Sequence, residues 1–311
     1  MKGLFFDGEK AVFKNDLPMP EPLPHESLVC ISIAAICNTD REIMRGYKPD
    51  FKGVLGHEFV GVVEKSSDPE LVGKRVVGEL NEGCGECIYC KTGRERHCES
   101  RKCIGITQKN GCFAQYMTIA TRLLHVIPDS LTDEKAVFTE PLAAALEIPD
   151  QIQIRPSEEV CVIGDGRLAF MIAQVLALTG AEVTVLGKHE EKLSRFKSFA
   201  KTATDCGRRF EIVIDAAGSP TGIETAMKLV RSKSTIVLKS TYAGNASVNL
   251  SQIVVNEVTV LGSRCGPFAP AVRLLSRGLL DLPQIELHEL SEWQNAFESR
   301  AFKVGFDMRL P

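Results

Sequence analysis

A glycine turn between an apolar run and a helical pattern constrains the fold of this chain most. Val160–Ile163 is continuously apolar, the turn follows, and a helical pattern covers Leu168–Thr179 before a second apolar run, Val183–Leu186. The turn has the pattern G-x-G-x-x-A over residues 164–169. This order predicts a βαβ unit whose glycines let a pyrophosphate approach the helix N-terminus. The residues predicted to bind the dinucleotide are Gly164, Asp165, Gly166, Arg167, Leu168, Gly187, Lys188 and His189.

Three further apolar runs continue this alternation downstream. They are Ile212–Ile214, Thr235–Leu238 and Val258–Leu261. Strands that alternate with helical stretches predict an α/β domain with a parallel sheet and right-handed crossovers. A helix is expected between Glu191 and Ala200, and because only a short connection leads from it to Phe210, that crossover is expected to be abbreviated.

The two ends of the chain have a different pattern. The first third contains the predicted strands Ser27–Ile36, Phe59–Val63 and Arg75–Val77. The tail, Leu287–Pro311, has a predicted helix near Glu292–Ser299 and a last strand near Lys303–Met308. Its pattern leaves open whether it closes the sheet or returns to the first domain. A length of 311 residues favours about two domains.

Four cysteines crowd into a segment without hydrophobic periodicity. They are Cys84, Cys87, Cys90 and Cys98, with the spacing C-x2-C-x2-C-x7-C. Four thiolates on a turning backbone can surround one zinc ion and leave no open position, which predicts a structural site. Unligated thiols or two disulfides are the alternatives. Nearby cations also suggest an RNA-binding zinc knuckle, although a solvated lobe whose cations offset the thiolate charge explains them better.

Ligand-type residues in three separate turns predict a second, open metal site. Cys37 follows an apolar run, His57 and Glu58 stand at the mouth of a strand, and Glu140 precedes Pro141. A Cys, His and Glu set with water is typical of catalytic zinc. Each residue also has a structural interpretation: Cys37 as a small buried hydrophobe, His57-Glu58 as a charged turn, and Glu140 as an N-cap. Because glutamate is a poor N-cap, Glu140 favours another role.

Composition excludes several classes of protein. Hydrophobic residues make up 44% and charged residues 25%, which are ordinary globular values. The apolar runs are too short to cross a membrane, and a net charge of −3 argues against a general nucleic-acid binder. The N-terminus lacks a basic region followed by an apolar one, so no secretory signal is predicted and a cytoplasmic location is expected.

Together these motifs resemble the zinc-containing medium-chain dehydrogenase/reductase family of alcohol, polyol and sugar dehydrogenases, along essentially the whole chain. In order they are Cys37-x-Thr39-Asp40, Gly56-His57-Glu58-x-x-Gly61, the four-cysteine lobe, Gly111-x-Phe113-Ala114-Gln115-Tyr116, Glu140-Pro141-Leu142-Ala143 and the glycine turn. The Glu140 element resembles the polyol and sugar branch, which takes its third zinc position from such a glutamate.

The resemblance implies a chaperonin-10-like β-rich catalytic domain, residues 1–147 and 266–311, and an inserted Rossmann domain with a doubly wound parallel sheet, residues 148–265. The tail would return to the catalytic domain, and the active site would lie in the cleft between the domains. The resemblance also implies two zinc ions per chain, a nicotinamide cofactor, a small alcohol or carbonyl substrate and a homo-oligomer, dimer or tetramer. Neither a nucleic acid nor a membrane is expected as a partner.

The resemblance further assigns roles to the open site. The catalytic zinc would be held by Cys37, His57 and Glu140. Glu58 would be an alternating ligand or an outer partner, Asp40 would orient His57, and Thr39 would begin a proton relay. Zinc would lower the pKa of the substrate hydroxyl, and hydride would pass to the nicotinamide. The alternatives are a zinc-dependent reductase of aldehydes or ketones, and a catalytically silent zinc- and nucleotide-binding redox sensor.

The end of the second predicted strand bears on the choice of cofactor. NAD sites place an Asp or Glu there to bind the ribose hydroxyls. This chain has Gly187 and then Lys188, with Lys192 one helical turn beyond. Glycine leaves room for a 2′-phosphate that these cations could bind, which predicts NADP over NAD. The alternative is a solvated helix start, with Glu190 or Glu191 binding the ribose.

Overall fold

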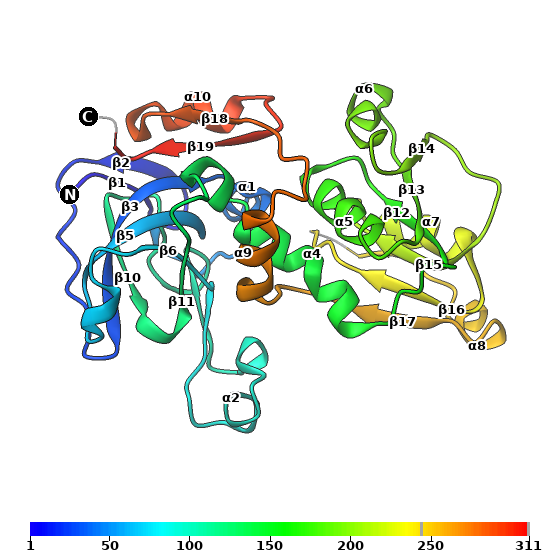
Figure 1. Cartoon of the computed structure of the whole chain (residues 1–311), viewed down its shortest axis with the longest axis horizontal. Helices are drawn as coiled ribbons and strands as arrows, with labels where there is room; N and C mark the ends of the chain where they lie inside the picture. Colours follow the sequence, from blue (N-terminus) through cyan, green and yellow to red (C-terminus); the bar gives the residue numbers. More distant parts are fainter. Residues whose placement is uncertain (243–244, 310–311) are drawn as a thin grey trace. The chain divides into compact units, whose positions relative to one another are not determined.

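The computed structural model describes residues 1–242 and 245–309, and the chain divides into two compact units. Unit 1 comprises Met1–Glu140 and Phe268–Pro311, and unit 2 comprises Pro141–Pro267 (Figure 1). Helix α4, Thr139–Gln151, runs through the first boundary. Within the described ranges, no helix combines the length and the apolarity that crossing a membrane would require.

Unit 2 is built on a parallel sheet with the strand order β14-β13-β12-β15-β16-β17. The strands are β12 Glu159–Ile163, β13 Glu182–Leu186, β14 Lys201–Ala203, β15 Phe210–Asp215, β16 Val230–Leu238 and β17 Thr259–Gly262. From β12 the chain adds β13 and β14 on one side of the sheet and then β15, β16 and β17 on the other. The sheet is therefore doubly wound and has the Rossmann strand order. Ile163 pairs with Leu186 of β13 on one side and with Asp215 of β15 on the other. The carboxyl ends of these three strands therefore lie next to one another.

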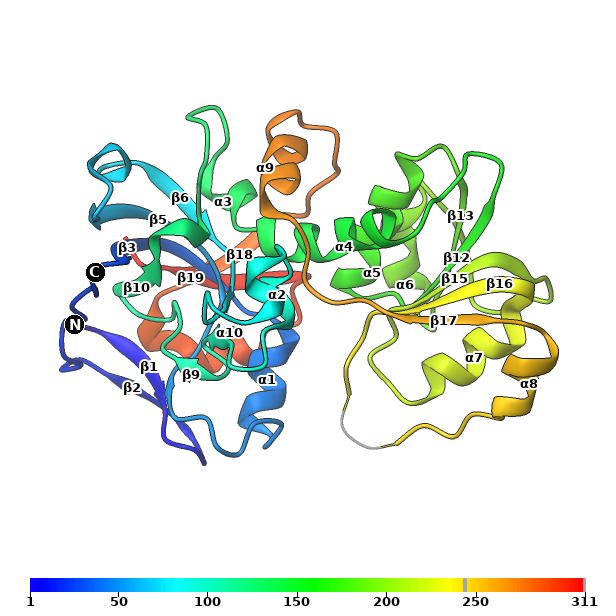
Figure 2. The same ribbon diagram turned by 90° about the horizontal axis from the view of Figure 1, so that it is seen from below.

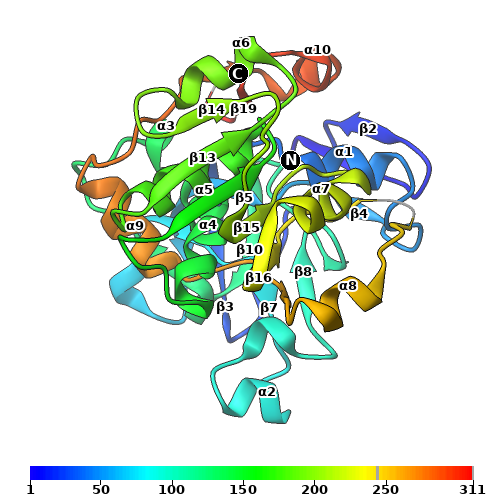
Figure 3. The ribbon, with the colours of Figure 1, turned by 90° about the vertical axis from the view of Figure 1, so that its right-hand side faces the viewer.

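Helices cover both faces of this sheet. They are α5 Arg167–Ala177, α6 Glu190–Leu193, α7 Thr221–Leu229 and α8 Leu250–Val255. Helix α5 packs on β12 and β13, and α7 packs on β15 and β16. Their right-handed crossovers leave the centre of the sheet in opposite directions, which places them on opposite faces (Figures 2 and 3). The central strands are therefore buried on both sides, which explains their continuous apolar runs.

The five predicted strands of this unit are confirmed, but the sheet has a sixth, β14. Its residues, Lys-Thr-Ala, form no apolar run, so the sequence pattern did not reveal it. The helix expected between Glu191 and Ala200 is wrong in extent, because α6 ends at Leu193 and a 3-10 turn, η4 Ser194–Phe196, follows. Phe196 is fully buried and packs edge-on against Phe170 of α5, with ring centroids 5.3 Å apart, which anchors this short crossover.

Unit 1 contains a seven-stranded sheet with the order β11-β6-β5-β3-β19-β18, and β10 also pairs with β3. The strands are β3 Glu26–Ala35, β5 Glu58–Lys65, β6 Arg75–Gly78, β10 Tyr116–Ala120, β11 Leu124–Val126, β18 Ile285–His288 and β19 Lys303–Asp307. The three strands predicted in the first third are confirmed as β3, β5 and β6. Strand β19, from the tail, pairs antiparallel with β3, so the tail joins the sheet of unit 1.

Smaller elements complete unit 1. Two three-stranded sheets have the orders β2-β1-β4 and β7-β8-β9, with strands β1 Gly3–Phe6, β2 Ala11–Lys14, β4 Gly53–Val54, β7 Asn81–Glu82, β8 Lys102–Ile104 and β9 Gln108–Lys109. The helices are α1 Asn38–Met44, α2 Ile88–Lys91, α3 Asp133–Ala136, α9 Phe268–Ser276 and α10 Trp293–Glu298. The sheet β7-β8-β9 and α2 frame the four-cysteine lobe (Figures 2 and 3).

Candidate active site and metal centres

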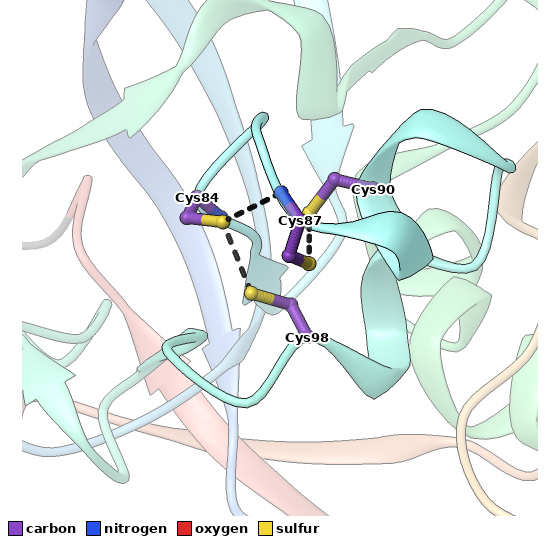
Figure 4. A group of neighbouring side chains, drawn as sticks. All are labelled: Cys84, Cys87, Cys90 and Cys98. Carbon is purple, nitrogen blue, oxygen red and sulfur yellow. Dashed lines mark hydrogen bonds between the residues drawn. The ribbon is translucent and has the colours of Figure 1, made fainter.

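The four lobe cysteines converge on one point. The sulfur atoms of Cys84, Cys87, Cys90 and Cys98 all lie within 4.8 Å of one another (Figure 4). All four are free thiols, and the sulfurs of Cys87 and Cys90 are 3.6 Å apart, far beyond the length of a disulfide. Gly85 adopts a φ of +79°, which lets the backbone turn between the first two cysteines. Four sulfurs around a common centre fit a closed, tetrahedral zinc site.

The protonation of these thiols also favours a cation at their centre. Backbone N–H groups of Glu86 and Cys87 lower the pKa of Cys84 to about 6, whereas burial and the neighbouring thiols raise the pKa of Cys90 to about 12. Without a cation, the Cys90 thiol keeps its proton near neutral pH, because burial and the neighbouring sulfurs oppose its ionisation. A bound Zn²⁺ would remove this conflict.

A second convergence involves Cys37, His57 and Glu58, whose ligand atoms also lie within 4.8 Å of one another. Strand β3 leads to Cys37 and strand β5 begins at Glu58, and the pairing of Ala35 with Glu58 places these two strand ends side by side. His57 and Glu58 are buried, and Cys37 is half-buried. The strand pairing therefore creates this group, because it brings Cys37 to His57 and Glu58, from which it is distant in sequence.

Asp40 lies behind this group in a fully buried position. Its Oδ2 accepts a hydrogen bond of 2.8 Å from the backbone N–H of Cys37, which begins helix α1. Its Oδ1 lies 3.5 Å from Nδ1 of His57, and neither of these two buried atoms makes a hydrogen bond within the described part of the chain. Burial lowers the pKa of His57, but the Asp40 carboxylate outweighs it and raises that pKa well above its usual value. A metal-bound imidazole is commonly oriented by such a carboxylate, so the arrangement fits zinc.

Glu58 carries a contact that the sequence did not predict. Lys303 of β19 is buried and forms an ion pair through Nζ with Oε2 of Glu58. The buried thiol of Cys112 lies 3.6 Å from the backbone oxygen of Glu58. Lys303 and Glu58 are separated by 245 residues, and only the pairing of β19 with β3 brings them together. No local motif signals such a contact.

Glu140 lies in the first turn of α4, and the group formed by Cys37, His57 and Glu58 does not include it. The prediction that Glu140 occupies an N-cap position is wrong, because α4 already begins at Thr139. Thr39 was predicted to begin a proton relay, and its hydroxyl lies 3.7 Å from the Cys37 sulfur. Thr39 thus adjoins the open group, while Glu140 belongs to a separate element.

The predicted cofactor residues gather at the carboxyl ends of β12 and β13. Gly164 adopts a φ of +124°, and a Cβ there would lie 2.6 Å from the backbone oxygen of Ala216, so this position requires glycine. Gly166 precedes α5, whose first residues are Arg167 and Leu168. Gly187, Lys188 and His189 follow β13 directly, and the carboxylate of Asp165 reaches across to them. The structure therefore brings all eight residues to the carboxyl ends of β12 and β13.

Another cluster of ligand-type side chains was not predicted from the sequence. His25, Glu26 and Glu82 place ligand atoms within 4.8 Å of one another. The ammonium group of Lys109 pairs with Glu26 and lies 3.7 Å from Glu82. This cation offsets the charge of both carboxylates, so the cluster ties the lobe strands β7 and β9 to β3.

Comparison with known proteins agrees with this architecture. The family model for the alcohol dehydrogenase GroES-like domain matches residues 23–129, and the model for zinc-binding dehydrogenase matches residues 168–277. The chain is 28% identical to D-arabinitol dehydrogenase 1 of Uromyces fabae, over 97% of this chain and 94% of that protein. It is 29% identical to D-arabitol-phosphate dehydrogenase of Enterococcus avium, over 91% of this chain and 89% of that protein.

Solved structures show the same fold. A putative zinc-binding dehydrogenase from Sinorhizobium meliloti 1021, bound to NADP, has a TM-score of 0.90 and 25% identity, with 98% of each chain covered. The rspB protein of Escherichia coli CFT073, in complex with NADH, has a TM-score of 0.90 and 24% identity, with 99% of each chain covered.

Proposed function

This chain belongs to the zinc-containing medium-chain dehydrogenase/reductase family, and from that premise we propose its reaction and the residues that perform it. The enzyme is an NAD(P)-dependent oxidoreductase that transfers a hydride between a hydroxyl of an alcohol, polyol or sugar and the nicotinamide. The observation that carries the proposal is the convergence of Cys37, His57 and Glu58 beside the buried Asp40.

Two zinc ions per chain are proposed. The lobe cysteines hold a structural ion, and Cys37 and His57 hold the catalytic one, with Glu140 as the third ligand and Glu58 as an alternating one. The domain that carries both sites comprises residues 1–147 and 266–311, and residues 148–265 bind the dinucleotide. When bound, the catalytic zinc lowers the pKa of a substrate hydroxyl, and the nicotinamide accepts the hydride.

The surrounding residues prepare the open group for this chemistry. Asp40 fixes the backbone at Cys37 and faces Nδ1 of His57, so it sets the orientation of the imidazole. The hydroxyl of Thr39, 3.7 Å from the Cys37 sulfur, passes the substrate proton toward solvent. Lys303 holds Glu58 and offsets its charge, which limits the negative charge that the site accumulates.

NADP is the proposed cofactor. Gly187 stands where an NAD site has its acidic residue, and Lys188 and His189 follow it. The Lys192 ammonium is 42% exposed and lies on α6, the short helix that begins directly after His189, so it is available to an anionic ligand. A 2′-phosphate would find donors here that an unphosphorylated ribose does not need.

A homo-oligomer is also proposed, either a dimer or a tetramer. Strand β17 is the edge of the parallel sheet, and the adjoining helix α8 leaves large apolar side chains exposed. Leu250, Val254 and Val255 are 69%, 75% and 79% exposed, respectively. Such a patch beside an open strand edge favours burial against a second copy.

An absorbance screen at 340 nm tests the reaction. Purified protein would be offered polyols, sugars, simple alcohols and aldehydes, each with NAD(H) and with NADP(H). Reduction of the cofactor by a polyol or sugar is the expected result. Turnover confined to aldehydes or ketones would favour a reductase, and zinc and nucleotide binding without any turnover would favour a silent sensor.

A further inference from the structure

A carboxylate lies at the end of β13, although the sequence has no acidic residue there. It belongs to Asp165, in the glycine turn after β12. Asp165 Oδ2 accepts hydrogen bonds from the backbone N–H of Lys188 at 2.9 Å, the backbone N–H of His189 at 3.0 Å and Nδ1 of His189 at 2.8 Å. The carboxylate that usually comes from the second strand thus comes from the neighbouring turn.

Gly187 and Asp165 form a matched pair. A Cβ at Gly187 would lie 2.7 Å from the Cβ of Asp165 and 3.0 Å from its Oδ2. Contacts below 3.0 Å between such atoms force a shift, so an acidic residue at position 187 is incompatible with Asp165 in its present place. The side chain of Asp165 thus occupies the place that an acid on β13 would need, and Leu193 Cδ2, 2.8 Å from the same Cβ, crowds it further.

Asp165 is poorly placed to bind the ribose through both of its oxygens, as the acid of an NAD site does. In an NAD site the acid accepts hydrogen bonds from the ribose, but Oδ2 of Asp165 already accepts three within the protein. Its Oδ1 lies 3.9 Å from the ammonium of Lys192, and the side chain is only 13% exposed. Burial raises the pKa of Asp165, but these hydrogen bonds outweigh it and lower the pKa, so the group stays ionised with its charge directed inward.

The same contacts leave donors for an anion. His189 is 51% exposed, and because Nδ1 faces Asp165, Nε2 stands on the other side of the ring. Asp165 also fixes the backbone at Lys188, the first residue after Gly187. When the ring carries a proton on each nitrogen, Nε2–H and a nearby ammonium can both donate to a phosphate.

We propose that Asp165 is a positioning residue for cofactor choice: it replaces the acid of the second strand, directs that charge into the protein, and holds Lys188 and His189 for the 2′-phosphate of NADP. The inference rests on the proposed function, which places the adenosine ribose at the end of β13.

Exchanging the two side chains tests this inference. The double variant Asp165→Gly with Gly187→Asp moves the carboxylate to the end of the strand, where only the flexible end of the Leu193 side chain has to shift to admit the new Cβ. Dissociation constants of NADPH and NADH would be measured by nicotinamide fluorescence on the full-length, zinc-loaded protein. The wild type is expected to bind NADPH at least about tenfold more tightly than NADH. This ratio corresponds to about 1.4 kcal/mol of binding free energy. In the double variant this ratio is expected to change about 100-fold, toward NADH, because the new carboxylate repels the phosphate.

A single substitution keeps the test decisive if the double variant fails to fold. His189→Gln should weaken NADPH binding about tenfold and leave NADH binding unchanged, because only the phosphate uses Nε2. His25→Gln, another exposed histidine, is the matched control and should change neither affinity.

Three results would overturn the inference: a wild type that prefers NADH, a folded double variant with the wild-type ratio, or equal losses of both cofactors in His189→Gln. Binding of NADPH needs no hydride transfer. Selective NADPH binding without turnover would therefore contradict the proposed reaction while leaving the role of Asp165 intact.

Discussion

The group of four lobe cysteines and the open group of Cys37, His57 and Glu58 both consist of zinc-binding residue types, but they differ in how the surrounding structure supports them. Among the lobe cysteines, Cys84 is exposed and Cys98 is buried, and the lobe has only two- and three-residue strands to hold them. The open group is set into long strands, with His57 and Glu58 4% and 2% exposed. In the lobe a bound metal would take the place of a hydrophobic core, whereas in the open group the fold itself assembles the ligands. The closed site should therefore govern stability, and the open site activity.

The largest effect on stability is expected from Cys98→Ser. Loss of one thiolate should release the structural zinc and disorder the lobe, since structural zinc contributes on the order of 10 kcal/mol in zinc-finger peptides. Metal analysis should fall from about two zinc ions per chain to about one, and limited proteolysis should cut between residues 81 and 103. Cys103→Ser is the matched control, because Cys103 is a buried cysteine of the same segment outside the cluster. Retention of both zinc ions by Cys98→Ser would contradict the four-thiolate site.

The next largest effect is expected from Lys303→Met, which leaves the buried Glu58 without its ion-pair partner. Removing one member of a buried pair costs about 3–5 kcal/mol of unfolding free energy. Urea denaturation of the zinc-loaded protein measures it. The double variant Lys303→Met with Glu58→Gln should recover much of this loss, because no unpaired charge remains. A cost below about 1 kcal/mol for the single variant would show that the pair is screened as a surface pair is.

Cys37→Ser is expected to have the opposite effect to Cys98→Ser: a large loss of activity and a small loss of stability. The catalytic zinc should be lost and turnover should fall about 10⁴-fold, since a metal supplies several kcal/mol of transition-state stabilisation. The free energy of unfolding should change by only about 1 kcal/mol, because strands β3 and β5 remain paired. Cys30→Ser, a half-buried cysteine on β3, serves as the control and should keep both zinc ions. A large loss of stability with Cys37→Ser would break the contrast between the two sites.

The two sites also differ in how far sequence predicts them. The lobe cysteines lie within fifteen residues, so their spacing alone predicted their convergence, and the apolar runs predicted the strands that lead to Cys37 and Glu58. Lys303 could not be predicted, because its contact with Glu58 depends on the pairing of β19 with β3. Gly187 indicated an empty position, but the fold fills it with the side chain of Asp165 from the neighbouring turn. Contacts between residues that are close in sequence can be predicted from their spacing. Contacts between residues on different strands can be predicted only when the strand pairing is known.

The smallest effect on stability is expected from Glu140→Gln. Glu140 lies in the first turn of α4, where a carboxylate interacts with the helix dipole by about 0.3–1 kcal/mol, so the melting temperature should hardly change. As the proposed third zinc ligand, however, Glu140 should be needed for turnover, and the catalytic zinc should become easier to remove with a mild chelator. Glu134→Gln, at an exposed glutamate of α3, controls for the loss of a carboxylate and should change neither property. Full activity of Glu140→Gln with a lowered melting temperature would instead assign Glu140 to the helix and leave Glu58 as the carboxylate of the open site, since Glu58 already lies with Cys37 and His57.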